Sequence, residues 1–153
     1  MKRRRASRKP REVFLSHSSR DRWIASRIAD MLRCHGIAVW YSRTHLRGAQ
    51  QWHDQIGAAL NRCDWFVVLV SKSSIKAKWV KHELVFALNS DRYENKVLPV
   101  QIGSCDPAEL SWTLKNFQIV DFTRGFGLGC RALLRTWGIR FRTTTQKRVR
   151  KTG

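Results

Sequence analysis

Five short apolar segments, separated by amphipathic ones, run along the chain and predict strands that alternate with helices. The expected strands are residues 12–16, 37–41, 64–70, 96–102 and 117–122. Such an alternation forms right-handed βαβ units and a parallel sheet that helices cover on both faces. We therefore expect an α/β fold, a flavodoxin-like doubly wound five-stranded parallel sheet with strand order 2-1-3-4-5, in a single domain.

The segment 64–70 gives the strongest strand signal, because its apolar run is almost unbroken. A strand that is apolar on both faces occupies a central, buried position in a parallel sheet. Pro99 interrupts the fourth expected strand and removes a hydrogen-bond donor, which predicts a less central position or a local irregularity. Residues 103–116 are expected to form a loop with one helical turn.

Apolar positions three or four residues apart predict the helices. The first follows Ser18-Ser-Arg-Asp21, a start signal close to a capping box, and ends near Gly36. Further helices are expected over residues 52–60, 78–88 and 127–138, and polar loops over 42–51 and 71–74.

Glu83 lies within the third expected helix with no cation as a helical neighbour. The residues three and four positions away are Trp79, Val80, Phe86 and Ala87, which share its face. A carboxylate on an apolar face is desolvated, and its pKa then rises. Such a group reaches water at the edge of the apolar stripe, pairs with a distant Lys or Arg, or is poised for chemistry.

The net charge of +19 is concentrated at the two ends of the chain. Residues 1–11 carry seven basic residues and residues 140–153 carry six, and neither segment contains an acidic residue. We expect a basic disordered N-terminal arm over 1–11, one domain over 12–139 and a basic C-terminal tail over 140–153. The arms either promote solubility or make weak, salt-sensitive contacts with nucleic acid or another polyanion.

Cysteine spacing and hydropathy exclude several classes of protein. The four cysteines form no Cys-x-x-Cys pair, which argues against zinc and against a thioredoxin-type site. Cys34 and Cys63 are expected to be buried reduced thiols. No apolar run approaches the ~20 residues of a membrane span, and no signal-peptide apolar region follows the basic N-terminus. We expect a cytoplasmic protein that makes no contact with a membrane.

Five segments in order resemble the Toll/interleukin-1 receptor (TIR) domains, especially bacterial-type members. They are Val13-Phe-Leu-Ser-His-Ser-Ser-Arg-Asp21, Gly36-Ile-Ala-Val-Trp-Tyr41, Leu46-Arg-Gly-Ala-Gln-Gln-Trp52, Phe66-Val-Val-Leu-Val-Ser-Lys-Ser-Ser74 and Trp79-Val-Lys-His-Glu-Leu84. Each segment alone is weak, whereas five in this order are specific. The resemblance covers about residues 12–139 and implies the same doubly wound fold.

Many TIR domains cleave NAD+ between nicotinamide and ribose, so the resemblance implies an NAD+ hydrolase in bacterial defence or immune-type signalling. The family's Trp-x-x-x-Glu motif falls on Trp79 and Glu83 and makes Glu83 the catalytic residue. NAD+ is then the substrate, no cofactor is needed, and the product is ADP-ribose or a cyclic ADP-ribose. The resemblance also implies self-association with other TIR domains and a possible separate sensor protein. The implied substrate-binding residues are Ser16, His17, Ser18, Arg43, Leu46, Arg47, Ser71, Lys72 and Trp79.

Several of these residues have a second interpretation. Ser18 is either a substrate contact or a helix cap, and Arg43 and Arg47 either meet the pyrophosphate or are solvated. Trp40, Trp52 and Trp65 are expected in the core, whereas Trp112 is an assembly or base-stacking candidate.

The chain departs from the TIR pattern in the long loop. Ser42 follows the second strand where many members have an acidic residue, and Gly48-Ala49 replaces the usual Pro-Gly. Both changes bear on the geometry of that loop and on substrate preference.

Three other functions compete with NAD+ cleavage. A non-catalytic TIR–TIR adaptor would not need Glu83 in its full context. A nucleic-acid-binding function is an alternative that rests only on the net charge of +19. A phosphoacceptor receiver shares the topology but is disfavoured, because the third strand ends in Ser71 and not in an aspartate.

Overall fold

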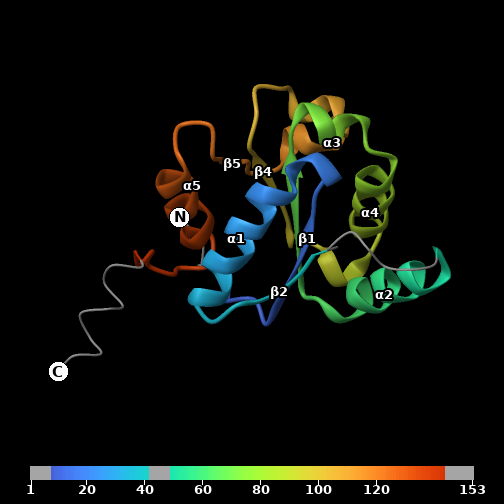
Figure 1. Cartoon of the computed structure of the whole chain (residues 1–153), viewed down its shortest axis with the longest axis horizontal. Coiled ribbons are helices and arrows are strands. Elements are labelled where there is room, and N and C mark those ends of the chain that lie inside the picture. The colour runs from blue at the N-terminus through green and yellow to red at the C-terminus, as the bar shows by residue number, and fades with distance from the viewer. Residues whose placement is uncertain (1–7, 42–48, 144–153) are drawn as a thin grey trace, which may run out of the picture.

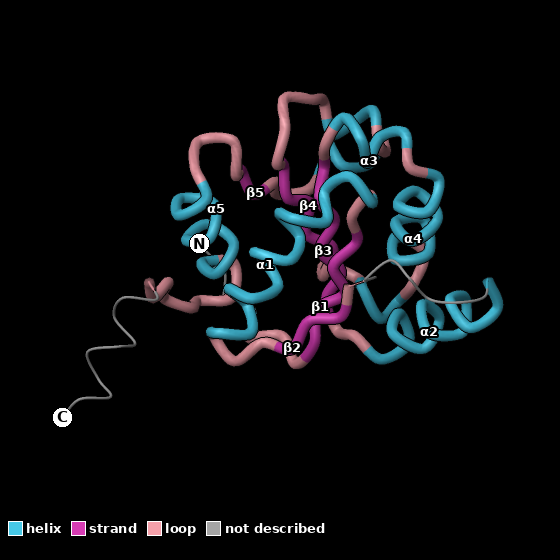
Figure 2. Tube along the Cα trace, in the orientation of Figure 1, coloured by secondary structure: helices cyan, strands magenta, loops and turns pink. Residues whose placement is uncertain are grey.

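Five parallel strands form one sheet in the order β2-β1-β3-β4-β5, as the sequence predicts (Figure 1 and Figure 2). The computed structural model describes residues 8–41 and 49–143. The strands are β1 (Glu12–Ser16), β2 (Ala38–Trp40), β3 (Trp65–Val70), β4 (Val97–Gln101) and β5 (Val120–Asp121).

Helices cover both faces of the sheet. They are α1 (Arg22–Cys34), α2 (Ala49–Arg62), α3 (Lys72–Lys76), α4 (Lys78–Leu88) and α5 (Phe126–Arg135). Figure 1 shows α1 and α5 on one side of the strands and α2 and α4 on the other. Two buried clusters fill the two layers, one beneath α1 and α5 and one beneath α2 and α4. The arrangement is the doubly wound one expected from the sequence.

The central strand β3 is buried along its whole length, which confirms the prediction from its apolar run. Its side chains alternate between the two layers, because successive strand residues point to opposite faces. Trp65, Val67 and Leu69 lie in the layer of α1 and α5. Phe66, Val68 and Val70 lie in the layer of α2 and α4.

Two tryptophans expected in the core are found there. Trp40 is half-buried and stacks on Phe14 with 4.9 Å between the ring centroids. Trp65 is buried and meets Trp137 edge-on at 5.4 Å. The side chain of Trp52 lies outside the described residues.

The two serine-rich segments, residues 16–19 and 71–74, differ from the prediction in which of them caps a helix. Residues 71–74, predicted as a loop, begin α3, and Ser71 and Ser74 cap that helix through reciprocal backbone and side-chain hydrogen bonds. Ser18 precedes a 3-10 helix (Ser19–Asp21), and its side chain makes no capping hydrogen bond. Its hydroxyl donates instead to Asp21 (2.8 Å). The interpretation of the Ser18 side chain as a helix cap is therefore wrong, because its hydroxyl donates to the Asp21 carboxylate and accepts no backbone N–H of the helix.

The last two strands differ in part from the prediction. The segment predicted as strand 117–122 pairs only as β5, because a 3-10 helix (Trp112–Asn116) occupies the residues before it and Phe117 N bonds back to Leu114 O. Pro99 lies on β4 between two strands, yet β5 pairs only with the two residues that follow it. The missing N–H of Pro99 therefore removes no hydrogen bond between β4 and β5.

Residues just outside the expected range 12–139 contact the domain. Arg11 N donates to the carboxylate of Asp64 (3.0 Å). At the other end, Phe141 packs against the core, and Arg142 N donates to His35 Nε2 (2.9 Å). The rest of the expected arms, 1–7 and 144–153, lies outside the described residues.

Cys34 is exposed, so the expectation of a buried thiol is wrong at that position, whereas Cys63 is buried as predicted. Cys34 follows the buried Leu32 by two residues, and 3.6 residues per turn places it on the opposite side of α1. In the described part of the chain, no helix is long and apolar enough to cross a membrane.

We expect Gly129→Ala to destabilise the fold by about 1–3 kcal/mol, the usual cost of overpacking a core. A methyl group at this position of α5 would overlap the ring of Phe122, which is itself buried. Urea denaturation of both proteins measures the difference. Gly127→Ala on the same helix is the matched control, because a methyl group there meets nothing within 4 Å. Equal loss of stability in both variants would contradict the prediction.

Candidate functional site

Glu83 is buried on the inner face of α4, with 8% of its surface exposed. The neighbouring residues on that face, Val80, Leu84 and Ala87, are buried as well. The helix forms here because residues 78–88 contain no Gly or Pro, and its apolar side chains pack onto the sheet. The carboxylate is thus held against an apolar layer, as the sequence predicts.

Ser16 is the described hydrogen-bond partner of this carboxylate. It ends β1, is 2% exposed, and its hydroxyl donates to Glu83 Oε1 at 2.9 Å. Among the described residues, neither ion pair involves Glu83, so pairing with a distant Lys or Arg is not seen there. The structure brings the first strand and α4 together at the carboxyl edge of the sheet, where ligands bind in open α/β folds.

The environment of Glu83 moves the titration of its carboxyl group towards neutral pH. Burial raises the pKa of Glu83 to about 7, and the hydrogen bond from Ser16 acts in the opposite direction. Removing water disfavours the charged carboxylate, whereas a donor to the carboxylate stabilises it. A carboxyl group with a pKa close to the working pH exists in both protonation states, which suits acid–base and electrostatic catalysis.

Ser16→Ala is expected to raise the pKa of Glu83 by about one unit, since a hydrogen bond to a charged group contributes roughly 1.5 kcal/mol. The variant keeps the buried site and loses only the hydroxyl that stabilises the carboxylate. A titration of the Glu83 side-chain carboxyl carbon by NMR measures the shift. Ser104→Ala, at an exposed loop position, is the control. An unchanged or lowered pKa of Glu83 in Ser16→Ala would contradict the assignment of this hydrogen bond.

Asp21 joins two loops at this edge, and the sequence analysis missed it. Its Oδ2 accepts hydrogen bonds from Ser18 (2.8 Å), three residues before it, and from Ser71, 50 residues after it. Ser71 also accepts from the backbone of Ser74 at the start of α3. One carboxylate therefore fixes the loop after β1 against the loop after β3. The Ser-x-x-Asp spacing was the available signal, but it was interpreted as a helix start.

His17 lies between these residues and β2. It is half-buried, its Nδ1 lies 2.7 Å from Ser18 O, and its ring centroid is 5.9 Å from that of Tyr41. Ser16, His17, Ser18 and Ser71 are therefore gathered at one edge, as expected. Lys72, the first residue of α3, is exposed there.

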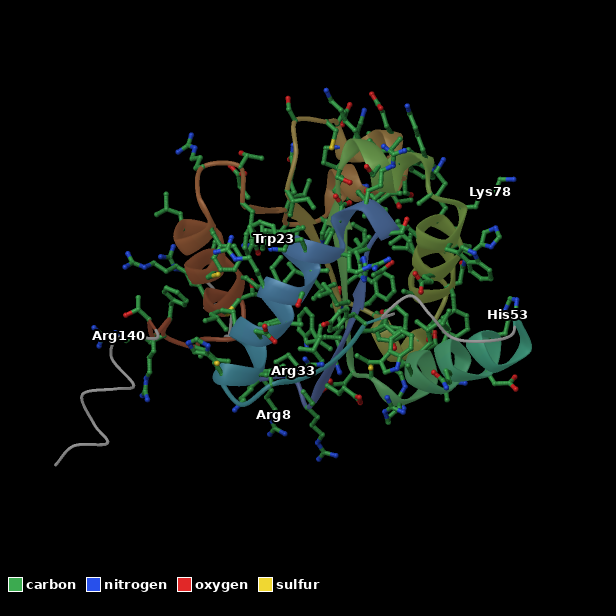
Figure 3. All side chains as sticks on the ribbon, viewed as in Figure 1. Arg8, Trp23, Arg33, His53, Lys78 and Arg140 are labelled. Atoms are coloured by element: carbon green, nitrogen blue, oxygen red, sulfur yellow. The ribbon has the colours of Figure 1, made fainter. Side chains whose placement is uncertain are left out.

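Trp79 lies one helical turn before Glu83 and is 42% exposed. Two histidines flank it, with ring centroids at 5.0 Å for His53 on α2 and 5.9 Å for His82 on α4. Figure 3 shows His53 and the start of α4, at Lys78, on the same side of the molecule. The sequence analysis did not single out these histidines, because no spacing rule relates α2 to α4.

Three predicted substrate contacts, Arg43, Leu46 and Arg47, lie outside the described residues, as do Ser42 and Gly48. The segment that contains them joins β2 to α2.

A family model described as the TIR domain matches residues 13–134, which include every described residue of this site. The chain belongs to the TIR domain family.

Relatives of this TIR domain include proteins named for NAD+ chemistry. The 2' cyclic ADP-D-ribose synthase BtTIR of Bacteroides thetaiotaomicron is 31% identical over 74 residues, which cover 48% of this chain and 26% of that protein. The probable 2' cyclic ADP-D-ribose synthase TcpO of Methanobrevibacter olleyae is 26% identical and is covered over 28% of its length. The NAD(+) hydrolase TcpC of Escherichia coli O6:H1 is 25% identical and is covered over 30%. The match thus spans about a quarter to a third of each relative.

Solved structures share the fold. The TIR domain of the Toll-related receptor TRR-2 of Hydra magnipapillata superposes with a TM-score of 0.59 at 18% identity, over 72% of this chain and 82% of that one. The TIR domains of the activated Roq1 resistosome give 0.53 at 20% identity, over 93% and 99%. At these identities the likeness shows the TIR architecture alone, which agrees with the fold predicted from the sequence.

Proposed function

We propose that this TIR domain cleaves NAD+ between nicotinamide and ribose. The observation that carries the proposal is the buried Glu83 carboxylate, which accepts a hydrogen bond from Ser16 at the carboxyl edge of the sheet. Proteins named as an NAD+ hydrolase and as cyclic ADP-ribose synthases among its relatives support the same chemistry. The proposed product is ADP-ribose or a cyclic ADP-ribose.

The proposed reaction breaks the bond between the anomeric carbon of ribose and the pyridinium nitrogen. The bonding electron pair moves to that nitrogen, so nicotinamide leaves as a neutral molecule and the ribose develops oxocarbenium character. A carboxylate beside the ribose stabilises this positive charge and accepts a hydrogen bond from a ribose hydroxyl. Water then attacks the anomeric carbon and releases a proton, or a hydroxyl or adenine nitrogen of the same molecule closes a ring.

The surrounding residues receive distinct roles in this proposal. Ser16 orients Glu83, and Asp21 holds the loops of Ser18 and Ser71 against each other. His17 and Lys72 lie at the rim where the rest of the substrate would extend. By the family resemblance, Trp79 lines the pocket, and Arg43, Leu46 and Arg47 contact the pyrophosphate side. NAD+ is the substrate, and the proposal requires no cofactor.

We further propose a cytoplasmic defence or signalling role in which activity depends on self-association or on a separate sensor protein. The TIR domains of the activated Roq1 resistosome are a precedent for assembled TIR domains. The exposed Val85 and Phe86 of α4 provide an apolar surface for such contacts.

Release of nicotinamide from NAD+ by the purified protein, followed by chromatography across a range of protein concentrations, tests the proposal. We expect release that rises faster than linearly with protein concentration, and a linear or cyclic ADP-ribose as the second product. Intact NAD+ at every concentration, even when the protein is clustered through a fused oligomeriser, would overturn the proposal and favour a non-catalytic TIR adaptor.

A further inference from the structure

The face formed by α1 and α5 is unusually rich in arginine. Exposed arginines stand on both helices and on the segments that flank α5, namely Arg22, Arg27, Arg33, Arg124, Arg131, Arg135 and Arg140. We call this set the arginine face. The exposed acid on α1, Asp30, lies 3.8 Å from Arg33, and no acid occurs in the sequence from Phe122 to its end. The described surface here is therefore strongly positive, independently of the terminal arms.

The kind of cation differs between the helices α1 and α5 and the helices α3 and α4, although α2, on the α4 side of the sheet, carries Arg62. Every basic residue of α1 and α5 is an arginine, whereas every basic residue of α3 and α4 is a lysine: Lys72, Lys76, Lys78 and Lys81. Solubility alone needs only charge, and lysine supplies it. The planar guanidinium group adds bidentate contacts to phosphate and stacking on flat rings. The arginine face thus has the side chains that recognise a phosphate backbone with bases attached.

A large aromatic ring stands in the middle of this charge. Trp23, at the start of α1, is 72% exposed. The Arg27 guanidinium lies between two rings, 4.9 Å from the centroid of Trp23 and 3.8 Å from that of Phe126 on α5. The cation–π contact holds the indole in place and leaves most of its surface in water. Figure 3 labels Trp23 and Arg33 along α1 and Arg140 just beyond α5.

An exposed, fixed indole among arginines matches one kind of partner. Bases stack on aromatic side chains while a positive groove follows the phosphates, which is how proteins bind single strands. In a duplex the bases are already stacked inside, so the indole would gain nothing. The arginine face of a second copy carries the same charge and would be repelled from this one. We propose that the arginine face binds single-stranded nucleic acid, with Trp23 stacking on a base and the arginines of α1 and α5 contacting phosphates.

The dimensions of the face suit a short strand. The 13 residues of α1 rise about 20 Å at 1.5 Å per residue, and α5 lies beside it over the same layer of the core. This length accommodates roughly four nucleotides, the lower end of the range for single-strand binding sites. The face lies across the sheet from α4, so binding there leaves Glu83 untouched.

Fluorescence anisotropy of a labelled 20-nucleotide single strand of mixed sequence, titrated with the full chain at physiological salt, tests the proposal. We expect Trp23→Ala to weaken binding about tenfold, since one stacked base contributes roughly 1–3 kcal/mol. Trp112→Ala is the matched control, because Trp112 is 75% exposed and its neighbouring acids are Asp106 and Glu109. That variant should bind as the parent does.

A charge-matched pair separates the arginine face from general electrostatics. Arg131→Glu/Arg135→Glu on α5 and Lys78→Glu/Lys81→Glu on α4 change the net charge equally, and all four residues are exposed. We expect at least tenfold weaker binding for the α5 pair than for the α4 pair. Glu83→Gln should bind the strand as tightly as the parent, so the result does not depend on NAD+ cleavage.

Three results would overturn the proposal. One is equal affinity of Trp23→Ala and Trp112→Ala. A second is an equal loss in the two charge-reversed pairs, which would assign binding to net charge and the basic arms. A third is tighter binding of a 20-base-pair duplex than of the single strand at the same salt concentration, because stacking on Trp23 would then be dispensable. Circular dichroism of each variant confirms that the fold is retained.

Discussion

Glu83→Gln is expected to abolish nicotinamide release from NAD+, lowering kcat/KM at least about a thousandfold. The amide is nearly isosteric with the carboxyl group and still accepts the hydrogen bond from Ser16, but it has no negative charge to stabilise the oxocarbenium-like ribose. The buried position offers no second described acid to replace it, because Ser16, Ser18, Ser71 and Ser74 are the other buried polar residues of the described chain. The measurement is steady-state nicotinamide release at a concentration where the parent protein is active.

Glu94→Gln is the matched control for this loss, because Glu94 is exposed and lies after α4 in a separate turn. The control should retain the parent rate. Retention of more than a tenth of the rate in Glu83→Gln, with an intact fold, would remove Glu83 from the catalytic role. Loss of activity in both variants would point to a change in assembly and not in chemistry.

Glu83→Gln is also expected to stabilise the fold at pH 8, by up to about 3 kcal/mol. The pKa of Glu83 is about 7 in the folded protein against an ordinary value of 4.5. Between these values the folded state holds a proton that the unfolded state has lost, so the stability of the parent falls as pH rises. Above about pH 7 the loss is complete, because the carboxylate must then be buried with its charge. Glutamine carries no such charge at any pH.

Urea denaturation of parent and variant at pH 4.5 and at pH 8 measures this difference. The gap in the free energy of unfolding should be small at pH 4.5 and large at pH 8, and other titrating groups cancel between the two proteins. A gap of the same size at both pH values would show that burial of the charge is not its cause. The result would make Glu83 a residue that costs stability and is retained for function.

The sequence was sufficient to predict the strand order and the position of Glu83 on an apolar helix face, and single residues show why. The unbroken apolar run of β3 requires burial on both faces, and the lack of a cation near Glu83 follows from helical spacing alone. The hydrogen bond from Ser16 is not predicted by the sequence, and the family resemblance implies Ser16 only as a substrate contact. This hydrogen bond joins residues 67 positions apart, and no local pattern specifies such a contact.

The features that the sequence analysis missed depend on contacts between distant elements. Ser18 and Ser71 stand in similar Ser-rich settings, and only the position of Asp21 decides that one donates to a carboxylate while the other also caps a helix. Composition suggests that a tryptophan belongs in the core, so the 72% exposure of Trp23 becomes visible only once α1 and α5 are placed beside each other. The strand predicted over 117–122 is longer than the observed β5, because periodicity does not show where the preceding 3-10 helix ends.

The separation of Ser16 and Glu83 along the chain has a consequence for synthesis. A ribosome makes Ser16 early, but Glu83 follows 67 residues later, and α4 must pack against β1 and β3 before the two side chains meet. A nascent chain that ends before α4 lacks Glu83, the proposed catalytic carboxylate. A translation product that ends before α4 therefore lacks the proposed activity, which requires that both Ser16 and Glu83 are made and that α4 is packed on the sheet.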